Sequence, residues 1–379
     1  STKSNFSGVS MNENKTRASF DQIGFVYSNK IGNNTSLRFV NFGFNYHKSK
    51  NFNRLFSMGG ALDNLSQSFQ LAQEMERYGL TESEFNDILD VKNPYTKYWN
   101  QLPVLGVMGV RTGVVDWVND SEKNIHAPWG WNGFNNNFFS KETGGISQYD
   151  FNVSFNIEDR VYLGATLGVY DVNYDRYTSY TENLNDDNGA DNGGYTLDNY
   201  YRLEGTGMDL KLGVIIRPIE SSPFRLGFAV HTPTWYDLRE SYNAALSSNI
   251  LACEAPYNQT LSDFLVTPEY DYLTYDYNLT TPWKFNISAG TTFAGAVAVG
   301  AEYEYQDYSS SKLKDVDGYE LGDQPSVENY LKGVHTFRIG METRIIPEFS
   351  IRAGYNYSSA AFSKDAYSAL SLYSTRTDF

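Results

Sequence analysis

The strongest constraint on the fold of this chain is a strict alternation of apolar and polar residues along about ten segments. One such segment reads FNVSFNI over 151–157, another WKFNISAG over 283–290, and a third VAVGAEYEY over 297–305. Period two is the signature of a β-strand, because successive side chains point to opposite faces of a sheet. In each segment one face is bulky and apolar, and the other carries glycine, amides or charges. The pattern therefore predicts an all-β fold built from long strands with two different faces.

The connections between these strands alternate between short and long. We predict strands at about 19–29, 35–47, 146–157, 160–175, 203–217, 223–236, 274–292, 295–306, 333–345 and 348–360. Short turns then fall at 30–34, 158–159, 218–222, 293–294 and 346–347, and long connections at 48–145, 176–202, 237–273, 307–332 and from 361 onward. Long strands with short turns at one end and long loops at the other are typical of a transmembrane β-barrel.

The parity of the connections also predicts an orientation. In outer-membrane barrels the short turns face the periplasm and the long loops face outward. The numbered chain is then expected to begin and end outside the cell. A barrel with both termini in the periplasm would need an odd number of strands before residue 1 and another odd number after residue 379.

Composition favours a membrane barrel over a soluble domain. The chain has 379 residues, 16% of them aromatic, yet its mean hydropathy is −0.48. A barrel explains both values, because only alternate strand residues face lipid. There is no apolar run of the roughly 18 residues that a transmembrane helix needs, and we expect any export signal to lie outside this segment. The net charge of −15 argues against binding nucleic acid.

The two faces of the predicted strands can be assigned to lipid and to lumen. The expected lipid-facing set includes Phe42, Phe44, Tyr46, Leu210, Leu212, Val214, Ile216, Leu226, Phe228, Val230, Phe337, Ile339 and Met341. The opposite face carries Asn41, Asn45, Asp209, Lys211, Arg225, Glu302, Glu304, Arg338, Glu342, Arg344 and Arg352. A charge on the lipid face costs about 2–4 kcal/mol, so the second set should line the lumen. These charges form either a structural network or a path for a polar or carboxylate-bearing solute.

The connection at 48–145 is too long to be structureless. Apolar residues recur at helical spacing over 62–78, and a T-x-x-E capping box at 81–84 predicts a second helix through Asp90. The stretch 99–118 is the most apolar of the chain, although it lies in a loop that should face water. Either it packs against the neighbouring helices as a lid, or it presents an apolar surface to a ligand.

The sequence offers no motif for catalysis. It contains no G-x-S-x-G, H-E-x-x-H, P-loop or C-x-x-C, so we expect neither enzyme activity nor a cofactor. His231 and His335 are candidates for a barrel-wall hydrolase by position alone, and a polar role on the wall is the plainer interpretation. The acidic run at 186–194 could hold Ca²⁺, but its spacing differs from an EF-hand and favours a solvated loop tip. The single Cys253 can form neither an internal disulfide nor a metal site.

Four features of the sequence resemble the FadL family of outer-membrane transporters for long-chain fatty acids and other hydrophobic compounds. They are the helical connection at 48–145, the strand pair YDFNV at 149–153 and YLGATLGVY at 162–170, the segments HTPTWY at 231–236 and TPWKF at 281–285, and the late hairpin from FRIG at 337–340 to RAGY at 352–355. The resemblance implies a barrel of about 14 strands with an N-terminal hatch, in which this chain supplies strands four to thirteen.

The resemblance also implies a docking groove for an apolar ligand. In this chain the groove would comprise part of 176–202 together with Leu102, Val104, Leu105, Val107, Met108 and Trp117. Lys97 or Arg111 would pair with a ligand carboxylate. The implied function is uptake of hydrophobic small molecules such as long-chain fatty acids across the bacterial outer membrane, by passive diffusion through a hatch-gated barrel with lateral exit. The alternative is a non-transporting barrel that binds a secretion or surface-attachment protein through the same loop.

Overall fold

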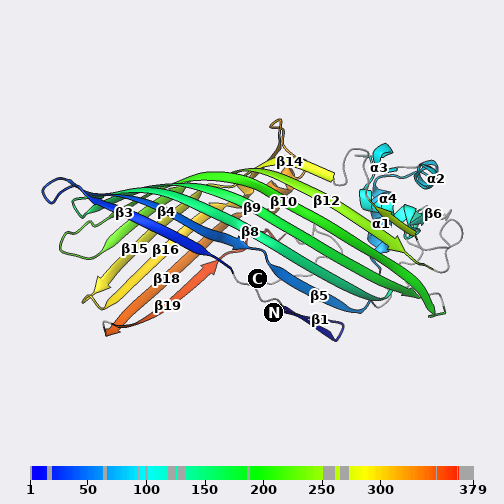
Figure 1. Ribbon diagram of the computed structural model, residues 1–379, viewed down its shortest axis with the longest axis horizontal. Coiled ribbons are helices and arrows are strands. Elements are labelled where there is room, and N and C mark those ends of the chain that lie inside the picture. The colour runs from blue at the N-terminus through cyan, green and yellow to red at the C-terminus, as the bar shows by residue number, and fades with distance from the viewer. Residues whose placement is uncertain are drawn as a thin grey trace.

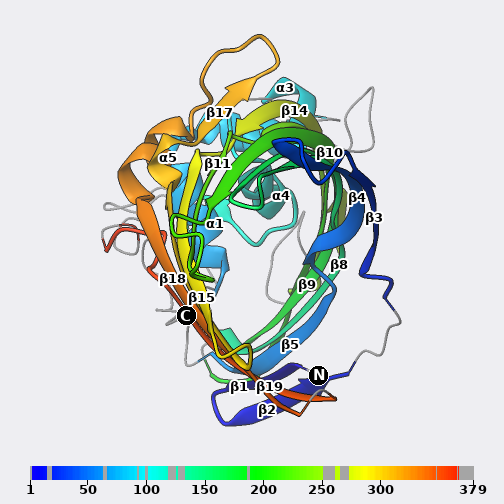
Figure 2. The ribbon, with the colours of Figure 1, turned by 90° about the vertical axis from the view of Figure 1, so that its left-hand side faces the viewer.

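Consecutive strands pair antiparallel along most of the chain, which confirms the all-β prediction. The computed structural model describes residues 2–14, 19–62, 66–91, 94–98, 101–117, 125–126, 133–185, 188–250, 261–264, 273–346, 348–364 and 366. Among them, a curved sheet runs in the order β19-β18-β16-β15-β11-β10-β9-β8-β4-β3. The bounds are β3 (Gln22–Lys30), β4 (Leu37–Asn51), β8 (Gly133–Ile157), β9 (Val161–Asn185), β10 (Asp191–Ile216), β11 (Arg225–His231), β15 (Lys284–Phe293), β16 (Val297–Asp307), β18 (Gly333–Ile346) and β19 (Phe349–Ser358). Figure 2 shows the sheet curving around a central space, as the wall of a barrel does.

Shorter elements extend this sheet or pack beside it. The strands that extend it are β5 (Arg54–Ala61), β12 (Trp235–Ser248), β13 (Leu261–Phe264), β14 (Leu273–Thr280) and β17 (Lys312–Asp315). Beside them lie the hairpin of β1 (Thr2–Phe6) and β2 (Val9–Glu13), the pair β6 (Asp116–Trp117) and β7 (Ile125–His126), the 3₁₀ turn η1 (Tyr308–Ser310) and the helix α5 (Gln324–Tyr330). The hairpin contacts β5, where the Ser7 hydroxyl donates to the Ala61 carbonyl at 3.0 Å.

The longest strands run far beyond their predicted ends. β8, β9 and β10 comprise 25, 25 and 26 residues and stay paired over nearly their whole length. Much of the connections predicted at 48–145, 176–202 and 237–273 is therefore strand. The pattern fails there because the outward face changes from apolar residues to Asn, Thr and Asp, so the alternation in hydropathy weakens while the strand continues. Figure 1 shows these strands reaching from one end of the molecule to the helices at the other.

Two neighbouring strands are interrupted at the same level by proline. Residues 232–234 separate β11 from β12, and residues 281–283 separate β14 from β15, which corrects the continuous strands predicted at 223–236 and 274–292. Proline has no amide hydrogen, so it cannot continue a ladder on both sides. The Thr234 amide donates instead to Thr281 Oγ1 at 2.8 Å, and the Thr281 amide donates to the Thr234 carbonyl at 3.0 Å. We call 232–234 together with 281–283 the strand break.

The outward face carries an apolar band that ends at the strand break. Its exposed side chains include Phe42, Phe151, Leu167, Leu210, Leu212, Phe228, Phe285, Ile287, Phe337, Ile339 and Met341, in agreement with the predicted lipid-facing set. On β10 the band runs from Met208 to Ile216, and the outward positions beyond it are polar. Trp235 and Trp283, both 48% exposed, stand at its edge. Tryptophan at the border of an apolar band is typical of a membrane–water interface.

Four helices lie at the far end of the sheet on its concave side, as Figures 1 and 2 show. Their bounds are α1 (Ser68–Arg77), α2 (Glu82–Asp90), α3 (Pro94–Lys97) and α4 (Val104–Arg111). The predicted capping box is confirmed, because Thr81 Oγ1 accepts from the Glu84 amide at 3.3 Å and Glu84 Oε2 accepts from the Thr81 amide at 2.9 Å. The buried faces of the helices pack against the ends of β9, β10 and β12, where Leu184, Leu197 and Leu246 belong to the same core. We call these four helices the helical cluster.

A buried carboxylate ties the helical cluster to the sheet. Glu182 on β9 is 0% exposed, and its Oε2 accepts from the Gln67 amide at 3.1 Å and from the hydroxyls of Tyr180 and Tyr195, each at 2.7 Å. Gln67 caps the start of α1, where the helix dipole favours a negative charge. Burial and the neighbouring Glu182 charge raise the pKa of Tyr195 well above its ordinary value, so its hydroxyl remains a hydrogen-bond donor.

Replacing Glu182 with leucine should loosen the helical cluster. The substitution removes the acceptor of one buried amide and two buried hydroxyls, and each unsatisfied group costs about 1–3 kcal/mol. We expect hydrogen–deuterium exchange of the α1 and α4 amides to accelerate at least about tenfold, while β15 and β16 keep wild-type rates. Glu204→Leu, at an exposed position of β10, is the control. Wild-type exchange in Glu182→Leu would show that this carboxylate does not hold the cluster.

Candidate functional site

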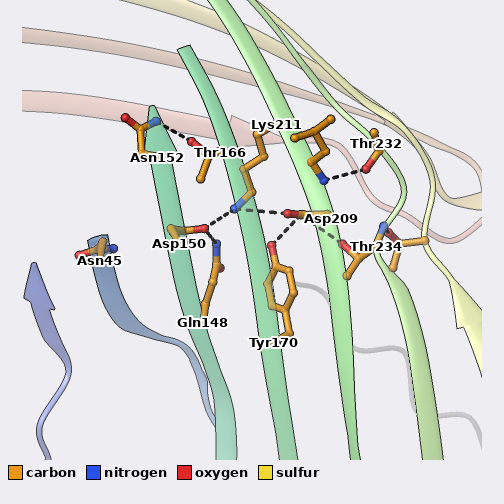
Figure 3. Close-up of polar contacts among 12 residues, drawn as sticks. Asn45, Gln148, Asp150, Asn152, Thr166, Tyr170, Asp209, Lys211, Thr232 and Thr234 are labelled. Atoms are coloured by element: carbon orange, nitrogen blue, oxygen red, sulfur yellow. Dashed lines mark hydrogen bonds and ion pairs between the residues drawn. The ribbon is translucent and has the colours of Figure 1, made fainter. Parts of the chain in front are cut away.

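The concave face of the sheet carries a connected polar network at the level of the strand break (Figure 3). Lys211 on β10 lies between two carboxylates, with its Nζ 2.9 Å from Asp150 Oδ1 and 3.7 Å from Asp209 Oδ1. Asp209 Oδ2 accepts from the Tyr170 hydroxyl at 2.7 Å and from the Thr234 hydroxyl at 3.4 Å. Asp209 is 4% exposed, so its charge depends on these partners. The network therefore joins β8, β9 and β10 to the strand break.

Two glycines leave the space that side chains in and beside the network occupy. A Cβ added to Gly168 would lie 2.3 Å from Asp209 Oδ1, and one added to Gly207 would lie 2.4 Å from the ring of Tyr236. Both distances are far below van der Waals contact, so a side chain at either position would displace its neighbour. Because these two positions lack side chains, Asp209 and Tyr236 can pack directly against the backbone of the sheet.

The same face carries further ion pairs on either side of the network. Beyond the strand break, Lys284 Nζ is 3.7 Å from Glu304 Oε1, and Arg338 Nη1 donates to Glu304 Oε2 at 3.2 Å. On the opposite side, His47 Nδ1 lies 3.6 Å from Asp150 Oδ2 and 3.0 Å from the side-chain nitrogen of Asn45, a polar contact that does not require a charged imidazole. Positive and negative groups alternate along the wall, which supports the structural reading of the predicted luminal charges.

An apolar hollow of about 340 Å³ lies directly beyond the network on the concave face. It is lined by Phe52, Glu142, Ile146, Val172, Tyr174, Leu203, Tyr236, Leu238 and Leu279. The Tyr236 ring connects the hollow to the network, because its centroid is 5.7 Å from that of Tyr170. Small-molecule sites typically measure about 300–1,000 Å³, and an engineered cavity of about 150 Å³ already binds benzene. The hollow is therefore large enough for a small apolar molecule.

Tyrosines line the concave face between the helical cluster and the hollow. The rings of Tyr174 and Tyr201 are 6.1 Å apart, and the Tyr201 hydroxyl donates to Glu240 at 3.0 Å. The Tyr242 hydroxyl donates to Asn199 at 2.6 Å, and burial raises the pKa of Tyr242 to about 12. These side chains stay neutral at physiological pH and present ring faces beside their bonded hydroxyls.

The residues predicted to form the docking groove lie on and around α4. Val107 and Met108 are 1% and 0% exposed and belong to the core of the helical cluster. The other four are partly buried and pack against that core: Leu102, Val104, Leu105 and Trp117. The structure thus brings all six together and turns two of them away from solvent.

The predicted carboxylate partners already have partners within the helical cluster. Lys97 Nζ is 2.5 Å from Asp87 Oδ2 and 5.5 Å from the centre of the Tyr98 ring. Arg111 Nη1 donates to carbonyls at the end of α2, including that of Leu89 at 3.3 Å. Hydrogen bonds from Lys97 and Tyr98 hold the pKa of Asp87 below its ordinary value. A ligand carboxylate would have to displace these contacts.

The two histidine candidates have structural neighbours. His231 aligns with Lys211 on one side and Lys284 on the other, and His335 Nδ1 is 2.8 Å from the Tyr303 hydroxyl. In the part of the chain that the structure describes, no three His, Cys, Asp or Glu residues gather as a metal site. Among the same residues, no helix has the length and apolar character to cross a membrane.

Other candidates from the sequence fall partly outside the described residues. In the acidic run at 186–194, residues 191–194 open β10 instead of forming a loop tip. Asp186, Asp187 and Cys253 lie outside the described residues.

The hollow was not predicted, although the sequence carries a signal for it. Along β9 the apolar residues of the band stand at odd positions such as Leu163 and Leu167, whereas Val172 and Tyr174 stand at even positions. On β10 the band uses even positions, and Leu203 is odd. This reversal in the phase of the alternation marks the level at which the apolar face turns from the outside to the inside.

Fold and site together define the class of the molecule: the wall of an antiparallel β-barrel with an apolar outer band and a polar and aromatic inner face. No protein-family model matches the sequence, and no curated protein matches it significantly. Solved structures with a similar fold include a CymD monoaromatic hydrocarbon channel, at a TM-score of 0.33 and 14% identity over 61% of this chain and 66% of that one.

Two further solved structures are similar at the same level. They are the toluene transporter TodX of Pseudomonas putida, at a TM-score of 0.39 and 11% identity over 89% of this chain and 67% of that one, and a TodX deltaS2S3 mutant hydrocarbon channel, at 0.37 and 11% over 91% and 68%. The chain spans about two thirds of the length of these three structures.

Substituting Gly168 with alanine should disrupt the polar network. The new methyl group would overlap Asp209 Oδ1, and overpacking of this kind typically costs about 1–3 kcal/mol. Gly164→Ala is the matched control on the same strand and face, because its nearest neighbour, Ser154 Cβ, is 4.0 Å away. Thermal unfolding of the refolded protein, followed by its heat-dependent gel mobility, should show a lower midpoint for Gly168→Ala alone. Equal midpoints would mean that the network tolerates the displacement of Asp209.

Replacing Lys97 with methionine should raise the pKa of Asp87 toward its ordinary value. Asp87 has a depressed pKa in the folded state, so its pairing favours folding above the unfolded pKa and is lost as the pH falls through the folded pKa. A ¹³C-carboxyl titration should therefore show the Asp87 transition at higher pH in Lys97→Met. Lys332→Met, remote from Asp87, should leave it unchanged. An unshifted titration in Lys97→Met would contradict the pairing.

Proposed function

We propose that the protein takes up hydrophobic small molecules across the bacterial outer membrane. The single observation that carries the proposal is the apolar hollow on the concave face, inside a wall whose outward band is apolar. A molecule in the hollow is shielded from water on one side by the sheet, and the lining offers mainly hydrocarbon and aromatic surface. The membrane placement supports this function, because the band on β10 is about nine residues long, as a transmembrane strand requires.

The proposed route begins at the helical cluster. Its partly buried side chains Leu102, Val104, Leu105 and Trp117 would make the first contact with the ligand, above the buried Val107 and Met108. The tyrosine-lined wall then leads along the concave face to the hollow. Each step offers an apolar or ring surface, so the ligand need not be exposed to bulk water between them.

The charges next to the hollow favour an uncharged ligand. Lys211 is already engaged by Asp150 and Asp209. Glu142 in the lining stands opposite Arg54 on one neighbouring strand and Arg176 on the other. A ligand carboxylate would lose solvation on entering and would compete with these acids for their cations. A neutral hydrocarbon or aromatic molecule is therefore the proposed substrate class, in preference to the ionised long-chain fatty acid that the family resemblance implies.

Lateral exit into the bilayer also belongs to the proposal. The hollow is lined by Tyr236 and Leu279, which flank the strand break on its far side. On the lipid-facing side a groove of about 730 Å³ is lined by outward side chains of the same strands, including Val230 and Phe285. The strand break thus lies between an apolar site within the barrel and an apolar site on its outer wall. Passive movement and a hatch as the gate remain expectations from the family resemblance.

Filling the hollow tests this function. Leu203→Trp places an indole in the hollow from β10 and should slow entry of the neutral fluorescent probe N-phenylnaphthylamine about tenfold, the equivalent of about 1.4 kcal/mol. Uptake is measured by the fluorescence rise in cells that carry equal amounts of folded protein in the outer membrane. Glu204→Trp, on the outward face of the same strand, should keep the wild-type rate. Uptake equal to that of cells without the protein, or an unaffected rate in Leu203→Trp, would refute the proposed route.

A further inference from the structure

The outward face of the long strands continues beyond the apolar band without a change of register. β8 pairs with β9, and β9 with β10, residue by residue from the band almost to the far strand ends. On β9 the part beyond the band is about 16 residues long, which corresponds to about 50 Å along the strand and about 35 Å of height at a tilt near 45°. We call this surface the distal outer face. It comprises the outward side chains of 135–147, 171–183, 196–206 and 237–247.

Most charged residues of the distal outer face stand next to the band, while Lys141 and Asp198 stand farther out, beside Tyr177. Arg202 Nε is 2.7 Å from Asp175 Oδ1, and Arg239 Nε is 2.6 Å from Asp276 Oδ1. Further acids at outward positions of the same strands are Asp171, Glu204 and Asp237. Both arginines are thus paired with carboxylates, and this zone holds more carboxylates than arginines. This zone does not favour an additional phosphate or carboxylate group.

An aromatic surface lies farther from the apolar band along the same strands. The ring centroids of Tyr177 and Tyr200 are 4.9 Å apart, and that of Phe139 is 6.2 Å from Tyr177. Tyr200 is 43% exposed, and the Tyr177 hydroxyl donates to Asp198 at 2.9 Å. Lys141 stands opposite Tyr177 on β8, and neutral hydrogen-bonding pairs lie farther along the strands, namely Thr181 with Thr196 at 3.0 Å and Asn183 with Asn135 at 2.7 Å. Exposed rings among hydroxyl and amide groups form a surface that is both apolar and rich in neutral donors and acceptors.

We propose that the distal outer face binds uncharged sugar rings of a glycolipid in the outer leaflet of the surrounding membrane. The proposal rests on the membrane placement in the proposed function and is independent of the transported molecule. The distal outer face is continuous with the lipid-facing band on the same strands, so the head groups of the lipids that cover the band lie beside it. Sugar rings combine C–H faces, which pack on tyrosine rings, with hydroxyls, which bond to Asn and Thr side chains.

The height of the rings and amides above the band selects the outer sugars of the head group as the ligand. Phosphates of an anionic lipid would lie closest to the bilayer, where the arginines are already paired with acids. The aromatic and amide groups lie farther out, where a glycolipid carries its outer sugars. The surface should therefore distinguish lipids by the sugars that they carry.

Binding of two lipopolysaccharides to the full chain in detergent tests the proposal. One probe carries neutral hexoses in its core, and the other is a deep-rough form that lacks them. We expect the hexose-bearing form to bind at least about tenfold more tightly, and the double variant Tyr177→Ser/Tyr200→Ser to lose that preference. Tyr319→Ser is the control, because Tyr319 is 74% exposed and lies between β17 and α5, away from the distal outer face. Equal affinity of the wild type for both lipids would overturn the proposal.

A second measurement needs no variant. Iodination of the wild-type protein should modify Tyr200 and Tyr319, and saturating hexose-bearing lipopolysaccharide should slow modification of Tyr200 while leaving Tyr319 unprotected. Equal protection by the deep-rough form would overturn the proposal. Failure of the glycolipid proposal can be distinguished from failure of the transport function, because N-phenylnaphthylamine entry reports on the hollow and not on the outer face. Loss of sugar selectivity with normal uptake refutes only the glycolipid site, and the reverse refutes only transport.

Discussion

The structure depends on one constraint above all: the backbone ladder between β8, β9 and β10 keeps a single register from the turn-bearing end to the helical cluster. A slip by one residue would turn every side chain to the opposite face. Because the register holds, Asp150, Lys211 and Asp209 meet on the concave face, while Leu210 and Leu212 stay on the outside. The same ladder carries Glu182 to the start of α1, so the helical cluster is placed by strands that begin in the band.

The strand break marks one height along the continuous sheet. Its prolines lie where the band ends outside, where the polar network crosses inside, and where the apolar hollow begins. Thr234 serves both structures, because it bonds the neighbouring strand through Thr281 and the network through Asp209. An interrupted ladder is costly unless its free groups find other partners. The hydroxyl of the threonine before each proline supplies such a partner: Thr232 Oγ1 accepts from the Leu210 amide, and Thr281 Oγ1 accepts from the Thr234 amide.

Much of the fold could be predicted from residues alone. The outward set around Leu212 and Phe337, the capping box at Thr81 and the tight turn at 158–159 follow from local patterns, because side-chain alternation, helix caps and turns depend on neighbours in sequence. Glu158 and Asp159 indeed adopt positive φ. Predictions failed where the outward face becomes polar, as along 176–185, since a solvated strand and a loop have similar compositions. The residues predicted to form the docking groove lie together in the structure, but the burial of Met108 depends on packing within the helical cluster.

By itself the sequence determined that this protein has long strands with two faces, which face is apolar in the outer band, and where the capped helix α2 and the short turns begin. Those properties are local, because the direction of a side chain in a strand follows from its position in the chain. Only the tertiary structure decided which side chains meet across strands: Lys211 between two carboxylates, Glu182 beneath a helix, and an apolar hollow assembled from strands far apart in sequence. Such contacts depend on register and curvature, and these are properties of the whole sheet.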